Sequence, residues 1–184
     1  MEQIKTALQE NLTKGRYEHV LRVCDTAEKL ALKHGVSAED ARLAALLHDY
    51  AKCMAPDTLR TLLIEADEDV RLFDFHHELW HGPAGAYLAK RDYGVTNKDV
   101  LNAVRYHTTG RANMSLLEKL IFVADLIEPG RQFPGIEKLR EAAEQSIEDA
   151  MQKCIGHSIQ YLATKRAAIF PDSLDCYNEY MLKN

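Results

Sequence analysis

The sequence has few cysteines, prolines and glycines, no excess of positive charge and no long apolar run. Its 184 residues include four Cys, five Pro and nine Gly, a composition that excludes collagen-like and low-complexity chains. The longest uninterrupted apolar runs, 43–47 and 120–124, contain five residues each, whereas a membrane-spanning helix needs about 20. We therefore expect a globular protein with no membrane partner.

The net charge indicates which partners to expect, and the cysteine pattern indicates the cellular compartment. With 23 basic and 28 acidic residues, the net charge is −5. Such a chain lacks the positive field that holds nucleic-acid phosphates, so we expect no nucleic-acid partner, although small phosphorylated ligands remain open. The four cysteines are scattered without a C-x-x-C pair, and the first residues contain no apolar leader. These features predict reduced thiols in a cytoplasmic protein.

Apolar residues recur three or four positions apart through most of the chain, which predicts helices. No six-residue stretch alternates cleanly between apolar and polar residues, as a half-buried strand would. Helix starts are expected near Gly15, Ser37, Asp57, Pro83, Thr96, Ser115 and Pro171, and helix ends or breaks at Gly35, Gly94 and Gly156. We predict an all-α, single-domain helical bundle over residues 1–184. Its ligand core spans about 16–131, and helices within 136–184 complete the bundle and border the site.

The pair His48-Asp49 ends the very apolar segment 41–47. A carboxylate beside an imidazole is costly to bury there unless it has a partner, and a metal ion is one such partner. Asp125 interrupts the apolar segment 120–127, so it also needs a cation nearby when it is buried. For each residue alone a structural role stays open, either as a solvated helix end or, for Asp125, as an acid bonded to arginine or backbone.

Residues 77–81 spell His-Glu-Leu-Trp-His, which matches the H-E-x-x-H signature of zinc proteases. That chemistry needs both histidines on one turn of a continuing helix. Here Gly82 and Pro83 follow the second histidine at once, which favours the start of a helix. We therefore do not expect a protease.

Histidines and aspartates follow one another in an order that resembles the HD-domain metal-dependent phosphohydrolases, which are helical bundles. The order is His19, His48-Asp49, His81, His107 and Asp125. The similarity narrows to the YqeK-type subgroup, described as symmetrical diadenosine tetraphosphate hydrolases that use iron. The matching segments are Arg16 to His19, Leu47 to Lys52, His81 to Ala86, His107 to Gly110, and Ala124 to Pro129.

The resemblance implies a ligand set and a substrate site. One metal ion would be held by His19, His48, Asp49 and Asp125, while His81 and His107 would complete a second metal site or face the phosphates. The implied metal is iron, as one or two ions, with Mn²⁺ or another divalent ion as a substitute. The implied catalytic residues are Asp49, Lys52, His81 and His107. The implied substrate-binding residues are Arg16, His19, Lys52, His81, His107, Thr108, Asp125, Arg131, Ile169, Phe170 and Pro171.

Three of these residues are cations placed close to the implied ligands. Lys52 lies one helical turn after Asp49, Arg16 lies one turn before His19, and Arg131 follows shortly after Asp125. Their spacing suits phosphate binding, although each also fits a solvated surface position.

The implied activity is metal-dependent hydrolysis of dinucleoside polyphosphates, with diadenosine tetraphosphate cleaved to two ADP. The partner is then a small-molecule dinucleotide, and a homodimer stays open. One alternative is a nucleotide phosphatase of the same fold that acts on another phosphate ester. Another is a non-catalytic nucleotide sensor, which the complete ligand set disfavours.

Overall fold

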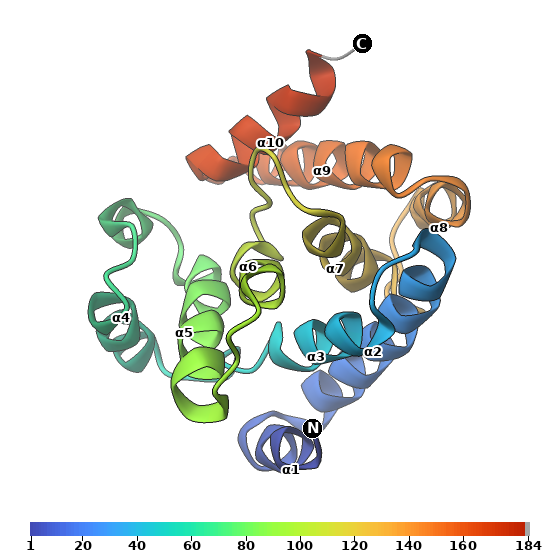
Figure 1. The fold of residues 1–184 in the computed structure, drawn as a ribbon. Helices are drawn as coiled ribbons and strands as arrows, with labels where there is room; N and C mark the ends of the chain where they lie inside the picture. The colour runs from blue at the N-terminus through green and yellow to red at the C-terminus, as the bar shows by residue number, and fades with distance from the viewer. Residues whose placement is uncertain (183–184) are drawn as a thin grey trace.

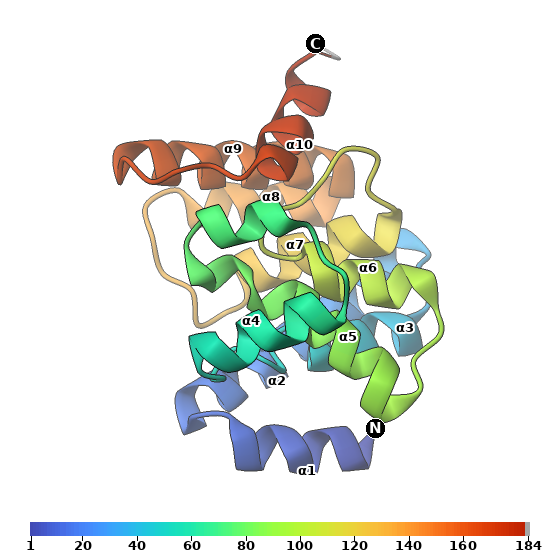
Figure 2. The ribbon, with the colours of Figure 1, turned by 90° about the vertical axis from the view of Figure 1, so that its left-hand side faces the viewer.

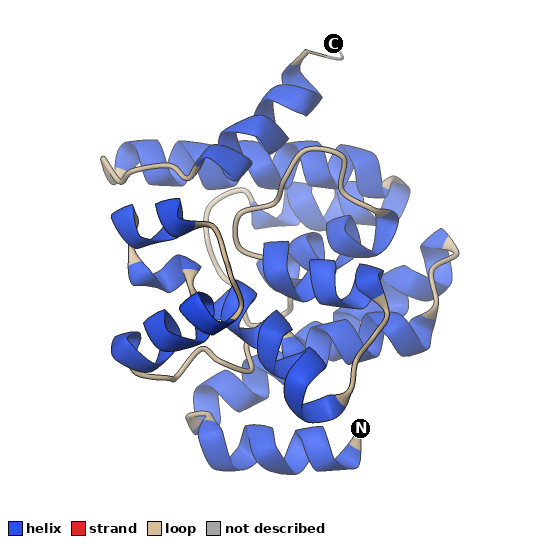
Figure 3. Cartoon of the chain, turned by 60° about the vertical axis from the view of Figure 1, so that its left-hand side comes forward, coloured by secondary structure: helices blue, strands red, loops and turns tan. Residues whose placement is uncertain are grey.

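The computed structural model describes residues 1–182, and within them the chain is built from helices and connecting segments without a strand (Figure 3). The predicted all-α fold is therefore confirmed. The elements are α1 (Glu2–Asn11), α2 (Lys14–His34), α3 (Ala38–Leu47), α4 (Pro56–Glu65), η1 (Val70–Asp74), η2 (His77–Leu79), α5 (His81–Tyr93), α6 (Lys98–Tyr106), α7 (Leu116–Ile127), α8 (Ile136–Gln145), α9 (Ile147–Thr164) and α10 (Pro171–Met181), where η denotes a 3-10 helix.

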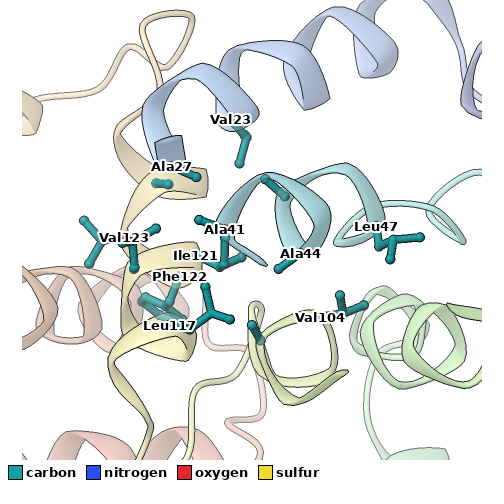
Figure 4. Close-up of a cluster of buried hydrophobic side chains, with 14 of the residues drawn as sticks. Val23, Ala27, Ala41, Ala44, Leu47, Val104, Leu117, Ile121, Phe122 and Val123 are labelled. Carbon is teal, nitrogen blue, oxygen red and sulfur yellow. The ribbon is translucent and has the colours of Figure 1, made fainter. Parts of the chain in front are cut away.

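Helix α3 lies in the middle of the bundle, packed against α2, α6 and α7 (Figure 1). Its alanines Ala41 and Ala44 are fully buried and allow close approach to Val23 of α2, Val104 of α6 and Ile121 of α7 (Figure 4). Burying a large apolar side chain contributes roughly 1.5–3 kcal/mol. The end of α3 is therefore fixed at the centre of the molecule.

Several predicted helix boundaries are confirmed. Gly35 ends α2 in the left-handed conformation, at φ 72°, which glycine adopts without strain. The Ser37 side chain accepts a hydrogen bond from the Asp40 N–H at the start of α3. Ser115 and Glu118 form a reciprocal capping box at the start of α7. Short-range hydrogen bonding therefore determines these boundaries.

Three other predicted boundaries are wrong. Helix α4 begins at Pro56 instead of being capped by Asp57, because proline is preorganised for the first helical position. The cap of α6 is Asn97, not Thr96. Gly156 does not break the helix and lies inside α9, because a glycine costs a helix interior only about 1 kcal/mol, which burial of neighbours such as Cys154 and Ile155 outweighs.

Helix α1 lies across one end of the bundle, and α9 and α10 lie across the other (Figure 2). The interior between these ends is occupied by α2, α3, α5, α6 and α7. None of the helices within residues 1–182 combines the length and the apolar character that crossing a membrane requires.

Candidate metal centre

The six predicted ligands lie together at the centre of the bundle. Five of them are buried, and Asp125 is partly buried. They are His19 on α2, His48 and Asp49 directly after α3, His81 at the first position of α5, His107 directly after α6, and Asp125 on α7. The packing around α3 therefore brings together side chains that are up to 106 positions apart in the sequence (125 − 19).

The Asp49 carboxylate lies between two pairs of histidines. Its Oδ2 atom is 3.5 Å from His19 Nε2 and 3.3 Å from His48 Nε2. Its Oδ1 atom is 3.2 Å from His81 Nε2 and 3.9 Å from His107 Nε2. Each pair forms a group with Asp49 in which the donor atoms all lie within 4.8 Å of one another. One carboxylate is thus shared by two potential metal positions.

Three of the four histidines are held by a backbone carbonyl three residues earlier. The bonds are His48 Nδ1 to Ala45 O at 2.6 Å, His81 Nδ1 to Glu78 O at 2.6 Å, and His107 Nδ1 to Val104 O at 2.7 Å. A carbonyl oxygen only accepts hydrogen bonds, so each Nδ1 carries the proton. Each ring therefore directs Nε2 toward Asp49, which is the orientation of a metal-ligating histidine.

The fourth histidine, His19, is held by a carboxylate instead. Its Nδ1 atom is 3.1 Å from Glu128 Oε1. Glu128 also accepts hydrogen bonds from Arg22 Nε at 2.6 Å and from the Gly130 N–H at 2.5 Å. Burial opposes ionisation of Glu128, but these donors outweigh it and lower its pKa. This role of Glu128 was not predicted from the sequence, although an acid that closes an apolar segment was a usable signal.

The buried ring nitrogens have too few partners without a cation. Nε2 of His19 lies 3.0 Å from Asp125 Oδ1 and Nε2 of His48 lies 3.3 Å from Asp49 Oδ2, but neither nitrogen makes a well-aligned hydrogen bond. Nε2 of His81 and Nε2 of His107 lie 2.9 Å apart, and with both Nδ1 atoms protonated their lone pairs face each other. Burial, together with His81 and His48, lowers the pKa of His107 to about 3, which keeps this ring neutral at neutral pH. Imidazole and carboxylate donors arranged in this way fit divalent metal ions.

Both aspartates are held in the ionised form. Burial raises the pKa of Asp49, but the neighbouring His48 and His81 outweigh burial and hold that pKa well below its usual range. Burial likewise opposes ionisation of Asp125, and its neighbours His19 and His48 lower its pKa overall. Ionised carboxylates are the form that binds metal ions.

The three cations that the resemblance assigned to phosphate each contact a carboxylate. The contacts are Arg16 Nη1 to Asp49 Oδ2 at 2.8 Å, Arg131 Nη2 to Asp125 Oδ1 at 2.7 Å, and Lys52 Nζ to Glu78 Oε2 at 2.5 Å. Arg16 and Arg131 therefore contact the cluster itself, whereas Lys52 contacts a carboxylate outside it. The arginine partner that a structural role for Asp125 requires is also present.

A cavity of about 900 Å³ adjoins the cluster. Thr108 lines it, and the hydroxyl of Thr108 is 3.1 Å from His107 Nε2. Its polar lining residues include Glu78, Thr108 and Arg131, and its apolar lining residues include Leu126, Phe133, Tyr161, Leu162 and Phe170. The Phe133 ring stacks on His157, with ring centroids 4.3 Å apart. The predicted residues Ile169 and Pro171 flank Phe170 and do not themselves line the cavity.

The H-E-x-x-H segment does not form a protease site. His81 lies in the buried cluster, whereas His77 is exposed and its ring stacks on His76, with centroids 4.4 Å apart. Residues 77–79 form a 3-10 turn, and α5 begins only at His81. The two histidines of the motif therefore do not share one turn of a continuing helix.

A helical bundle with a central His-Asp pair defines the class of this protein. The family model described as the HD domain matches residues 16–130, the segment that contains all six clustered residues. The chain therefore belongs to the HD-domain family, as its sequence resemblance predicts.

Relatives place the chain more closely within this family. A symmetrical bis(5'-nucleosyl)-tetraphosphatase of Halalkalibacterium halodurans is 44% identical, with 94% of this chain and 92% of the relative covered. A Bacillus subtilis protein of the same name is 40% identical, with 96% and 95% covered. Within the HD-domain family, the chain belongs to the group of symmetrical bis(5'-nucleosyl)-tetraphosphatases.

A solved structure has the same fold over the whole chain. It is described as a predicted HD superfamily hydrolase involved in NAD metabolism, from Clostridium acetobutylicum. The two chains are 36% identical and superpose with a TM-score of 0.94. The superposition covers 100% of this chain and 97% of the other.

Proposed function

We propose that this chain hydrolyses dinucleoside polyphosphates and cleaves diadenosine tetraphosphate symmetrically into two ADP. The observation that carries the proposal is the cluster around Asp49 next to a cavity that is lined by both polar and aromatic side chains. The names of relatives that are 40% and 44% identical over nearly the whole chain support the same activity.

The proposed metal ligands are His19, His48, Asp49 and Asp125 for one ion, and Asp49, His81 and His107 for a second. Divalent ions bound there would supply Lewis acidity and lower the pKa of a water molecule that attacks phosphorus. We assign iron, with Mn²⁺ or another divalent ion as a substitute, because the donor set combines imidazole and carboxylate without thiolate.

The side chains around the cluster bind and orient the phosphates. Arg16, Lys52 and Arg131 exchange their carboxylate partners for phosphate oxygens and stabilise the negative charge that develops during hydrolysis. The Thr108 hydroxyl, at the junction of cluster and cavity, donates a hydrogen bond to the same chain of phosphates.

The apolar lining residues of the cavity bind a nucleoside. Phe133 and Phe170 present aromatic rings there, and an adenine base gains stacking energy against such rings. Burial lowers the pKa of His157, so this ring is neutral when it stacks on Phe133. Because the base is bound in the cavity and the phosphates lie at the cluster, the distance between the two positions determines which phosphorus is attacked.

The proposed partner is thus a small-molecule dinucleotide, without nucleic acid. We also propose a cytoplasmic location, because Cys24, Cys53, Cys154 and Cys176 are all free thiols. A homodimer stays a prediction.

Product analysis tests the cleavage position. If one nucleoside is bound in the cavity, cleavage follows the second phosphate counted from it, whatever lies beyond. Diadenosine tetraphosphate is then expected to give only ADP, and the pentaphosphate analogue to give ADP and ATP. The products are separated by chromatography after a short incubation.

The alternative functions give different products in the same assay. AMP and ATP from the tetraphosphate would contradict symmetrical cleavage. Release of phosphate from mononucleotides without dinucleotide cleavage would favour the nucleotide phosphatase. Binding without turnover in the presence of Fe²⁺ and Mn²⁺ would favour the sensor.

Metal removal tests the cofactor. Mildly purified protein is expected to contain at least one transition-metal ion per chain, measured by elemental analysis. A chelator should abolish dinucleotide cleavage, and added Fe²⁺ or Mn²⁺ should restore it. Full activity in a chelator, together with no metal in the protein, would rule out a metal-dependent mechanism.

A further inference from the structure

We propose that Glu78 is a positioning residue that competes with phosphate for the Lys52 ammonium and thereby weakens the binding of the product. This inference rests on the proposed function, since it concerns the phosphates of the same site. It gives a role to the one acid of the H-E-x-x-H segment, which the metal cluster does not use.

The three phosphate-binding cations differ in the carboxylates that they contact. Arg16 and Arg131 contact carboxylates that belong to the proposed metal cluster. A metal ion that binds those carboxylates takes up their charge and leaves both arginines available. Lys52 differs, because its partner Glu78 is not one of the proposed metal ligands. Metal binding therefore does not release Lys52 from its carboxylate.

The carboxylate partner of Lys52 lies at the cavity. Glu78 lines the cavity together with Arg131 and Thr108. The Lys52 side chain is 19% exposed and that of Glu78 is 54% exposed, and Nζ and Oε2 are 2.5 Å apart. An ion pair so open to solvent is weak. A phosphate chain, which carries several negative charges, can therefore displace the carboxylate from Lys52.

The backbone of Glu78 is held by hydrogen bonds that do not involve its side chain. The carbonyl oxygen of Glu78 accepts the hydrogen bond from His81 Nδ1 at 2.6 Å. Its N–H donates to His76 Nδ1 at 3.2 Å. A change confined to the carboxylate thus leaves the orientation of His81 intact.

These contacts define an exchange cycle. Lys52 leaves Glu78 when polyphosphate enters the cavity, and it returns to Glu78 when the product departs. Without the carboxylate, Lys52 has no competing partner and stays on the phosphate. Glu78 therefore speeds the release of ADP by lowering the affinity for it.

The test compares the metal-loaded full-length chain with Glu78→Gln. Calorimetric titration with ADP is expected to show a dissociation constant about two- to fivefold lower in the variant, the range that an exposed ion pair supplies. The KM for diadenosine tetraphosphate should fall by a similar factor, while kcat does not rise. The matched control is Glu2→Gln, because Glu2 forms an exposed pair with Lys5 at 2.8 Å on α1. The control should leave both constants unchanged.

A second background isolates the role of Lys52. In Lys52→Met, adding Glu78→Gln should no longer change ADP affinity. A similar gain in that background would overturn the proposal, because it would show simple repulsion between Glu78 and phosphate. Weaker ADP binding in Glu78→Gln alone would also overturn it, as would unchanged binding. If the parent chain neither cleaves the dinucleotide nor binds ADP, the proposed function itself fails.

Discussion

Replacement of Asp49 by Asn is expected to reduce dinucleotide hydrolysis by more than about 100-fold and to lower the metal content of both sites. Both oxygens of Asp49 face histidine pairs, so this one carboxylate serves two positions. Loss of even the outer partners of metal ligands costs roughly 10–100-fold. Asn keeps the shape but not the charge, so the fold is expected to survive. Turnover, elemental analysis and circular dichroism of the variant check this prediction.

The matched control for Asp49→Asn is His77→Ala. His77 belongs to the same histidine-rich part of the sequence but is exposed and lies outside the cluster. Its replacement should leave most of the activity and all of the metal. Equal losses at the two positions would contradict the assignment, as would full metal content in Asp49→Asn.

Replacement of Gly82 by Ala is expected to destabilise the protein and to disturb the metal centre. A Cβ atom at this position would lie 2.7 Å from the carbonyl oxygen of Arg105 and 3.3 Å from that of Val104. These are backbone atoms of α6, so relief requires α5 to move away and to carry His81 with it. Overpacking of this kind costs roughly 1–3 kcal/mol, and a displacement of 1 Å can cost about 100-fold in rate. Thermal unfolding and turnover measure the two effects.

Gly85→Ala is the control for the previous variant. Gly85 lies one turn further along α5, and its Cβ would lie 3.5 Å from Leu47 O and from Val104 Cγ1, an ordinary packing distance. Alanine also favours the helix over glycine by about 1 kcal/mol. This variant should therefore unfold at the same temperature as the parent or higher. A loss of stability equal to that of Gly82→Ala would show that the contact with α6 is not decisive.

The helices and the candidate metal ligands could be predicted from the sequence, because both leave local signals in it. Apolar periodicity and caps such as Ser115 act over one or two turns. His48 and Asp49 stood out because polar groups at the end of an apolar helix need a partner. The family resemblance then connected residues that are far apart in the chain.

The remaining contacts depend on tertiary packing, because a local pattern can mark a single residue but not its distant partner. Glu128 holds His19 although the two are 109 positions apart, and Lys52 reaches Glu78 across 26 positions. The apolar lining of the cavity was only partly predicted: Phe170 was an implied substrate-binding residue, but nothing nearby in sequence indicated His157. The helix break predicted at Gly156 is absent because the packing of α9 outweighs the weak intrinsic preference of glycine against helix.

The bonds that hold His48, His81 and His107 span only three residues each. Each ring is therefore oriented by a backbone group of its own segment and needs no partner from another helix. The packing of the helices brings together three segments whose Nε2 atoms point in the required direction. An ion that enters the assembled bundle reorients none of these rings, so its affinity is not reduced by their conformational entropy. His19 is the exception, since its orientation is set only after α2 meets the end of α7.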